Sequence, residues 1–380
     1  MSGPGFRGPQ RRQTPMLGGP SLPALSEGRD HTMVKWGVIG CGGIADRRTI
    51  PGMMEAKNVE LVAVMDVDAA ALERVAGKYG VKKKYFAVDD LLADDEIQAV
   101  YIATPVHLHR DQAVAAAEAG KHVLVEKPLA LTVPLGQDVV AAGRAHNVKI
   151  TEGYMMKFQR LHQKAREMVQ QGAIGKVVLA RAQLSCWYPD IPGAWRQAPQ
   201  LGGGGALMDM ATHCYDLLAW ILGSPIKEVF AFADTQTFKY PVEDSSTTLL
   251  KFGQGAHGVV DCFFNVPDAA GQDRLELYGN KGSILAEGTI GQVAGGKMVA
   301  FLSDEAKEYD PQQSKSSLDV TVREIIAEPK NMYAAEVEYL SECIEQDREP
   351  QLNSAQEGLK VLRAAEAAYE SARTGERVVL

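Results

Sequence analysis

The sequence predicts an α/β protein with two successive domains: a doubly wound parallel sheet, then an α+β domain with a large, mostly antiparallel sheet. The chain has 380 residues and 46% hydrophobic content, and a single core rarely grows beyond about 250 residues. From Val34 to about Gly153, short β-branched runs alternate with alanine-rich helical stretches, which is typical of a parallel sheet covered by helices. Beyond about Leu161 this alternation ends, and from Glu228 strand-like runs follow one another between glycine or proline turns, which favours antiparallel pairing.

Residues 1–32 are predicted to form a flexible N-terminal extension. They are rich in Gly, Pro, Arg and Ser and lack the apolar core of a signal peptide, although Arg11-Arg12 resembles a twin-arginine address. With so few large apolar side chains, this segment cannot offset its own ordering entropy. We expect it to be disordered or to lie on a neighbouring subunit.

The first domain is predicted to span residues 33–155 as a Rossmann-type domain, with a helix after each of its first four strands. The expected strands are Lys35 to Ile39, Glu60 to Met65, Ala99 to Ile102, His122 to Val125 and Lys149 to Gly153. The chemically interesting residues follow the ends of these strands.

The second domain is predicted to span residues 156–380, with a helix to Gln171, a strand from Lys176 and a helix from about Leu207 to Leu222. An antiparallel meander is expected from the runs Glu228 to Phe238, Ser246 to Phe252, His257 to Asn265, Arg274 to Tyr278 and Ser283 to Glu287. Two closing helices, Met332 to Gln346 and Ser354 to Ser371, should pack back on the body. Because so few helices cannot cover so long a meander, one apolar face should meet another subunit in a homodimer or homotetramer.

Composition excludes several classes of function. A net charge of -8 with dispersed acidic residues leaves no basic footprint for nucleic acid or an anionic membrane. No uncharged apolar run approaches the roughly 18 to 20 residues of a membrane-spanning helix. The five cysteines are scattered and show no C-x-x-C spacing, which argues against a disulfide framework and a zinc site. A cytoplasmic location is the expectation.

A dinucleotide-binding fingerprint ends the first predicted strand. The segment has the form G-x-G-x-x-A and enters a helix: Gly40 permits the tight turn, Gly42 lets the backbone approach a pyrophosphate, and Ala45 allows close helix packing. Gly43 and Ile44 complete the predicted cofactor loop.

Asp66 closes the second strand about 20 residues after the fingerprint, where an acid can bond the ribose hydroxyls of a dinucleotide. A carboxylate there would repel the 2′-phosphate of NADP, and Val67 and Asp68 supply no cation to offset it. NAD is therefore favoured over NADP. The alternative is that Asp66 only caps the following helix.

Two further motifs carry a family resemblance. Glu126-Lys127-Pro128 follows the fourth strand, and the run from Gly203 to His213 reads G-G-G-x-L-x-D-x-x-x-H. With the fingerprint and Thr104-Pro105, these motifs resemble the glucose-fructose oxidoreductase, inositol dehydrogenase and rhizopine-catabolism (Gfo/Idh/MocA) family over nearly everything after Val34. The resemblance implies a Rossmann domain, a C-terminal domain whose open sheet makes subunit contacts, and NAD(P)-linked oxidation or reduction of sugars, cyclitols or related polyols.

The same resemblance implies roles for individual residues. Lys127 matches the family's catalytic lysine, Asp209 its carboxylate and His213 its acid/base, while Glu126 and Pro128 place the lysine beside the nicotinamide. Trp195-Arg196 resembles a W-R pair that lies near substrate and cofactor in anhydrofructose-reductase-like members.

The chain departs from the family pattern at two motifs. T-P-N-x-x-H becomes Thr104-Pro105-Val106-His107-Leu108-His109, which keeps the last histidine but loses the asparagine side chain. We expect Thr104, Pro105 and His109 to line the cofactor site. G-Y-M-x-R-F becomes the segment from Gly153 to Phe158, in which Tyr154 and Lys157 are the expected substrate contacts, although lysine lacks the planar fork of arginine.

The candidate chemistry follows from these residue types. Oxidising a secondary alcohol sends a hydride to the nicotinamide and a proton to a base. His213 titrates closest to neutrality and is the expected base, while Lys127 can hold the oxygen as negative charge develops. Asp209 lies four residues before His213, so on one helix both should share a face. The lysine already supplies a positive charge, so no metal is expected.

Three function classes remain open from the sequence. The first is a sugar or cyclitol dehydrogenase or reductase. The second is an NAD-using glycosidase that oxidises its substrate transiently and then eliminates the glycosidic bond. The third is a non-catalytic dinucleotide-binding sensor, against which the intact Lys127, Asp209 and His213 argue.

Overall fold

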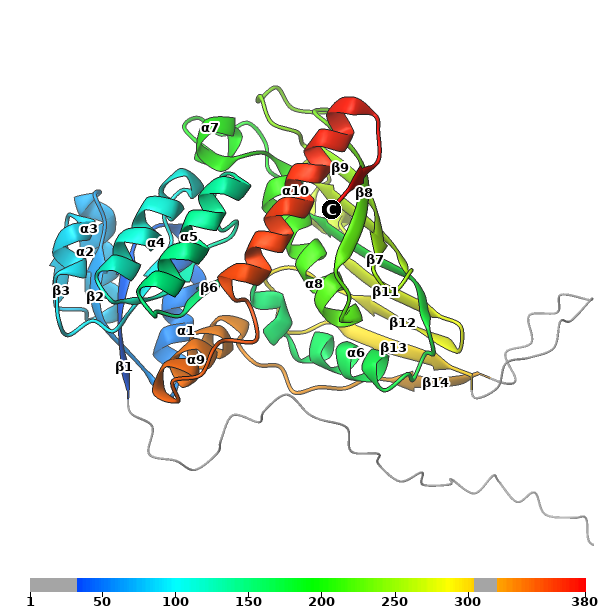
Figure 1. Ribbon diagram of the computed structural model, residues 1–380, viewed down its shortest axis with the longest axis horizontal. Helices are drawn as coiled ribbons and strands as arrows, with labels where there is room; N and C mark the ends of the chain where they lie inside the picture. The colour runs from blue at the N-terminus through cyan, green and yellow to red at the C-terminus, as the bar shows by residue number, and fades with distance from the viewer. Residues whose placement is uncertain (1–32, 304–319) are drawn as a thin grey trace, which may run out of the picture. The chain divides into compact units, whose positions relative to one another are not determined.

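The computed structural model describes residues 33–303 and 320–380, which contain two separate β-sheets and the helices that cover them (Figure 1). The extension expected at residues 1–32 lies outside the described residues. The boundary expected between residues 155 and 156 stays a prediction.

The first sheet has six strands in the order β3-β2-β1-β4-β5-β6, and all of its strand pairs are parallel. The strands are β1 (Val34–Ile39), β2 (Val59–Met65), β3 (Lys83–Tyr85), β4 (Ala99–Ile102), β5 (His122–Val125) and β6 (Ile150–Glu152). This order confirms the doubly wound arrangement. The sequence missed β3 because a short, half-exposed strand at the sheet edge carries no apolar run.

Helices cover both faces of this sheet. Side chains of one face, including Trp36 and Tyr101, pack with α1 (Ile50–Glu55), α2 (Ala69–Tyr79) and α9 (Met332–Glu345). Side chains of the other face, including Val100, pack with α3 (Val88–Leu92), α4 (His109–Glu118) and α5 (Val133–Ala145). Trp36 Nε1 donates a hydrogen bond to Ser341 Oγ of α9 at 3.0 Å. The first of the two closing helices therefore packs back on the N-terminal sheet, as the sequence predicts.

The second sheet has nine strands in the order β14-β13-β12-β11-β7-β10-β9-β8-β15. They are β7 (Val177–Ser185), β8 (Ile226–Asp234), β9 (Ser245–Phe252), β10 (His257–Phe263), β11 (Arg274–Gly279), β12 (Gly282–Glu287), β13 (Lys297–Leu302), β14 (Thr321–Glu324) and β15 (Val378–Val379). Apart from the parallel pair of β7 with β10, its strand pairs are antiparallel.

The expected uninterrupted meander is wrong at its centre, because β7 inserts between β10 and β11. The connection between those two strands is long enough to pass β7, and it contains Pro267 and the 3-10 turn η6 (Asp268–Ala270). The strand expected over Glu228 to Phe238 also ends early, at Asp234. The backbone N–H groups of Gln236, Thr237 and Phe238 donate to the Asp244 carboxylate at 2.8 to 2.9 Å, which turns the chain out of the sheet.

One face of the second sheet packs against α8 (Thr212–Leu222) and α10 (Ala355–Thr374), and α6 (Arg160–Gln170) packs against α8 (Figure 1). On the opposite face Phe232 is 62% exposed and Leu249 is 50% exposed. Among the described helices, none is long and apolar enough to cross a membrane.

Candidate active site

The candidate residues gather at one edge of the first sheet. Gly40 follows β1, Asp66 follows β2, Thr104 lies two residues beyond β4, Lys127 lies two residues beyond β5 and Gly153 follows β6. Because all six strands are parallel, their carboxyl ends meet at the same edge, where open α/β sheets bind ligands. The topology therefore brings these separate motifs together.

The loop from Gly40 to Ala45 fits a dinucleotide. Gly40 has a φ of +98°, and a Cβ atom there would lie 3.0 Å from the carbonyl carbon and oxygen of Ala103, so glycine is required. No atom lies within 4 Å of the position that a Cβ on the exposed Gly42 would take. The backbone at Gly42 is thus open for close approach by a pyrophosphate.

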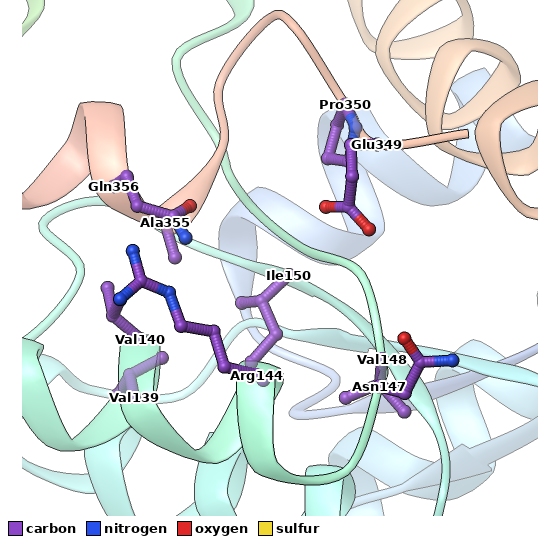
Figure 2. A pocket seen from close by; sticks show the side chains of 11 residues that line it. Val139, Val140, Arg144, Asn147, Val148, Ile150, Glu349, Pro350, Ala355 and Gln356 are labelled. Carbon is purple, nitrogen blue, oxygen red and sulfur yellow. The ribbon is translucent and has the colours of Figure 1, made fainter. Parts of the chain in front are cut away.

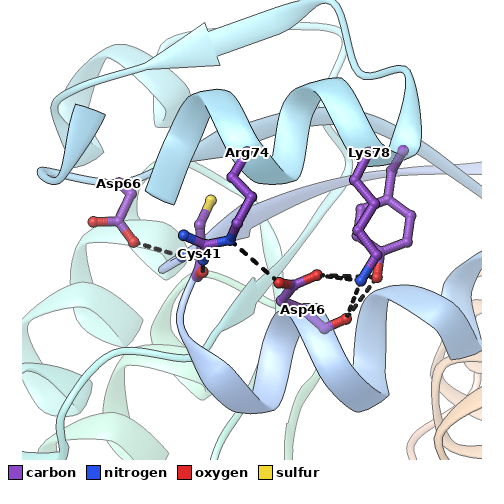
Figure 3. A network of polar contacts seen from close by, with 6 residues as sticks. Cys41, Asp46, Asp66, Arg74 and Lys78 are labelled. Carbon is purple, nitrogen blue, oxygen red and sulfur yellow. Dashed lines mark hydrogen bonds and ion pairs between the residues drawn. The ribbon is translucent and has the colours of Figure 1, made fainter. Parts of the chain in front are cut away.

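The Asp66 carboxylate is held by backbone donors. Its Oδ2 accepts from the N–H of Cys41 at 2.7 Å (Figure 3). Its Oδ1 accepts from the N–H of Asp68 at 2.8 Å. The N-cap of α2 is Asp68, whose Oδ1 accepts from the N–H of Ala70 at 2.9 Å. The alternative that Asp66 serves only as this helix cap is therefore wrong.

Arg74 is a cation beside the Asp66 loop that the sequence argument missed. Its Nη2 donates to the carbonyl oxygen of Cys41 at 3.3 Å, and its Nε lies 3.5 Å from Asp46 Oδ2 (Figure 3). The side chain is 53% exposed. Arg74 is eight residues beyond Asp66, and only the packing of α2 places it against the fingerprint.

Lys127, Arg196 and Asp209 form a cluster of side chains from three segments. Lys127 Nζ donates to Asp209 Oδ1 at 2.6 Å and to the Asp209 carbonyl oxygen at 2.7 Å. Arg196, in the turn η4 (Trp195–Gln197), donates from Nε to the same Oδ1 at 3.3 Å, and its guanidinium lies 4.2 Å from the centre of the Trp195 ring. The structure thus unites the E-K-P, W-R and glycine-rich motifs.

Electrostatics keep the Asp209 carboxyl ionised. Burial opposes ionisation, but the Lys127 and Arg196 cations outweigh it and hold the pKa of Asp209 below its ordinary value. An ammonium has three donors, and Asp209 takes two of those of Lys127. One donor of Lys127 is left for a substrate oxygen.

His213 lies at the start of α8, after the π-helical turn η5 (Leu207–Ala211) that carries Asp209. The ring meets Tyr154 edge-on, with the ring centres 5.4 Å apart and an interplanar angle of 81°. His213 is 8% exposed, and its Nδ1 has no hydrogen-bond partner among the described residues.

The expectation that His213 titrates near neutrality needs correction. Burial, and after it the Lys127 charge, lower the pKa of His213 well below its ordinary value, while Asp209 opposes this shift. In the free protein the imidazole is therefore neutral at pH 7, the state in which it can accept a proton.

Glu126 supports the Lys127 loop from inside the protein. Tyr101 Oη donates to Glu126 Oε1 at 2.5 Å, and Thr49 Oγ1 donates to Tyr101 Oη at 2.9 Å. The N–H of Lys127 donates to Glu126 Oε2 at 3.3 Å. Burial raises the pKa of Glu126.

The structure buries His109, which the sequence analysis expects to line the cofactor site. The ring is 1% exposed, with Nδ1 at 2.8 Å from the carbonyl oxygen of Pro128 and Nε2 at 2.9 Å from that of Thr104. It bridges the turn after β4 and the turn after β5, and burial lowers its pKa to about 4. Little of its surface is left for a cofactor to contact, while Thr104 and Pro105 remain partly exposed.

Tyr154 and Lys157, the expected substrate contacts, are buried as well. Tyr154 is 1% exposed and Lys157 is 2% exposed. The Lys157 ammonium lies 2.6 Å from Asp216 Oδ1. Both side chains are packed inside the protein because α8 covers the segment that follows β6, an arrangement that the local motif does not encode.

A cavity of about 340 Å³ lies elsewhere, between α5 and the start of α10 (Figure 2). It is lined by Arg144, Val148 and Ile150 among others, at the amino end of β6. None of the candidate residues lines it, so we assign it no part in the chemistry. Within residues 33–303 and 320–380, no group of three or more His, Cys, Asp or Glu side chains could hold a metal ion.

Two family models match the chain. Residues 34–154 match "Oxidoreductase family, NAD-binding Rossmann fold", and residues 162–296 match "GFO/IDH/MocA C-terminal domain".

Among similar proteins, 1,5-anhydro-D-fructose reductase of Ensifer adhaerens is 28% identical over 90% of this chain and 98% of its own length. D-xylose 1-dehydrogenase (NADP(+)) 2 of Haloferax volcanii is 30% identical over 91% of this chain and 99% of its own length. The structure of aldose-aldose oxidoreductase from Caulobacter crescentus, complexed with glycerol, superposes with a TM-score of 0.81 at 29% identity, over 92% of this chain and 100% of that one.

Proposed function

The chain belongs to the Gfo/Idh/MocA family of oxidoreductases, and from this premise we propose that it transfers a hydride between NAD and a secondary alcohol or ketone of a sugar, cyclitol or related polyol. The observation that carries the proposal is the cluster of Lys127, Arg196 and Asp209 beside a buried, neutral His213 at the ligand-binding edge of the first sheet. Relatives named as an anhydrofructose reductase and a xylose dehydrogenase support the class of substrate.

In this proposal the bound nicotinamide supplies or accepts the hydride, and the chain's own residues handle the oxygen and the proton. Lys127 directs its remaining ammonium donor at the substrate oxygen and stabilises the negative charge that develops there. His213 takes the hydroxyl proton during oxidation and returns it during reduction. Asp209 and Arg196 fix the ammonium so that it need not reorganise during the reaction.

A panel of sugars, cyclitols and polyols, assayed for net NAD reduction at the reduced-nicotinamide absorbance, tests this function. Net turnover of at least one member is the expected result. Release of a glycosidic product without net reduction would identify the transient-oxidation mechanism instead. Cofactor binding without any turnover across the panel, in both directions, would indicate a sensor and refute the proposal.

We propose NAD as the preferred cofactor, because a carboxylate held at Asp66 repels a 2′-phosphate. Arg74 opposes this preference, since its exposed guanidinium can partly offset the repulsion. The Haloferax relative is named for NADP(+), so the preference has to be tested in this chain. The ratio of the NADP dissociation constant to the NAD dissociation constant should be above one in the parental protein. Asp66→Ala should lower this ratio, whereas Arg74→Ala should raise it. Tighter binding of NADP than of NAD by the parental protein would contradict the assignment.

We also propose that the open face of the second sheet is a subunit contact, which makes the protein a homodimer or homotetramer. Phe232 and Leu249 are exposed on the same face of two adjacent strands, and apolar side chains gathered on one exposed face mark interaction sites. Sedimentation at micromolar concentration should give at least twice the mass of one chain. Phe232→Glu with Leu249→Glu should shift the protein toward the monomer, because two charges then face the contact. A parental protein that sediments as a monomer would refute the proposal.

A further inference from the structure

Lys157 and Asp216 form an ion pair that is almost completely removed from water. Lys157 lies in the turn η3 (Met155–Phe158), and Asp216 lies in α8. Their Nζ and Oδ1 atoms are 2.6 Å apart, and the side chains are 3% and 5% exposed. Burying two charges is costly and is sustained only by close pairing, so this pair places a strict constraint on how the two segments lie together.

The same two segments meet a second time at His213. Tyr154 lies three residues before Lys157, and His213 lies three residues before Asp216. The ring centres of Tyr154 and His213 lie 5.4 Å apart. The segments are therefore joined by an aromatic contact and, three residues further along each of them, by an ion pair. Residues three apart on a helix are neighbours on one face, which places Asp216 beside His213.

His213 lacks an orienting hydrogen bond at Nδ1 among the described residues. In many enzymes a carboxylate bonded to that nitrogen orients the ring, but Asp209 is engaged by Lys127 and Arg196 instead. The turn before His213 is π-helical and has no side-chain cap. The position of the ring therefore depends on how α8 is fixed against its neighbours.

We propose that Lys157 and Asp216 are positioning residues for His213: their ion pair fixes the first turn of α8 against the segment after β6 and so holds the imidazole against Tyr154. This inference rests on the proposed function for its effect on turnover. Its structural content, the placement of the His213 ring, stands apart from any substrate.

Other charged groups near the pair do not replace it. Glu152, at the end of β6, is fully buried, and its two carboxylate oxygens have no hydrogen-bond partner among the described residues. Burial, and after it the charge of Asp216, raise the pKa of Glu152 to about 8. Glu152 is therefore mostly neutral at pH 7 and does not compete with Asp216 for the Lys157 ammonium. Burial, which the charge of Lys157 opposes, raises the pKa of Asp216 to about 6, and the charge of Glu357 in α10 adds to this rise.

The test replaces one partner at a time, with Lys157→Met and Asp216→Asn. Each variant should lose about 10-fold or more in kcat, while its NAD dissociation constant stays within about 2-fold of parental, since the fingerprint and Asp66 are untouched. Lys149→Met is the matched control, because Lys149 is also a buried lysine, 4% exposed, that pairs with a carboxylate, Asp347, at 2.8 Å. It precedes the amino end of β6, away from the candidate site, and should keep parental kcat.

A substrate-free readout separates this inference from the proposed function. The groups that act on the His213 charge are Lys127 and Asp209, and neither changes in these variants. A ring released from Tyr154 gains water, so its pKa should rise toward the ordinary value in an NMR titration, with the resonance assigned by its loss in His213→Asn. The Lys149→Met control should leave that pKa unchanged.

A double variant without either charge, Lys157→Met with Asp216→Leu, controls for loss of the fold in the single variants. Replacing a buried ion pair by apolar residues is often neutral for stability. It should remain folded by thermal unfolding and still show the raised His213 pKa. If the folded single and double variants keep the His213 pKa of the parental protein, the inference is overturned. This holds whether or not the protein turns over a sugar. A raised pKa in a protein that turns over no sugar would sustain the positioning and count against the proposed function.

Discussion

Lys127→Ala is expected to lower kcat by about 100-fold or more while the NAD dissociation constant stays within about a few-fold of parental. The lysine ammonium, fixed by Asp209 at 2.6 Å, would act mainly on the charge that develops on the substrate oxygen. A group that acts in the transition state affects kcat rather than ground-state binding. The cofactor should be held chiefly by the Gly40 loop and Asp66, with a small loss because Lys127 adjoins the expected nicotinamide site.

Arg196 allows a control on that interpretation. In Lys127→Ala the Asp209 carboxylate keeps Arg196 as a partner at 3.3 Å, so the carboxylate is not left without a cation and the fold should survive. Lys127→Arg keeps the charge but changes its reach, and should recover only part of the lost kcat. Steady-state kinetics and cofactor titration by fluorescence measure both quantities. Near-parental kcat in Lys127→Ala would remove the lysine from the mechanism.

His213→Asn should produce a loss of similar size, about 100-fold or more in kcat, together with a change in the pH profile. Asparagine keeps a hydrogen-bonding group of similar size but has no titrating nitrogen. In the parental protein, oxidation should slow as the pH falls through the pKa of His213, because the protonated ring cannot accept a proton. This acidic limb of the pH profile, in which kcat/KM falls as the pH falls, should be absent in the variant.

The position of the limb is itself diagnostic. Because burial and Lys127 lower the pKa of His213, the limb in kcat/KM, which reports the free enzyme, should lie below the ordinary histidine value near 6.5. NAD binding by the variant should stay within about a few-fold of parental. A variant that keeps both parental kcat and an unchanged acidic limb would show that another group is the acid/base.

The sequence by itself determined the parts of this protein that local patterns encode. Strands that are buried on both faces read as short apolar runs, so β1, β2, β4 and β5 were predicted to within a residue at each end. The G-x-G-x-x-A turn was readable because the position of Gly40 admits no side chain. Through the family resemblance, the E-K-P and glycine-rich motifs predicted that Lys127, Asp209 and His213 share one site, and the structure brings Lys127 into contact with Asp209.

Only the tertiary structure decided which distant residues meet. The parallel pairing that inserts β7 between β10 and β11, and the approach of Arg74 to the fingerprint, depend on packing between segments that no local periodicity relates. The same holds for Lys157, whose motif suggested a substrate contact but whose charge is buried against Asp216, 59 positions away. A pattern of residue types sets which side chains can be buried, whereas the close packing of α8 on the segment after β6 sets which charge each of them faces.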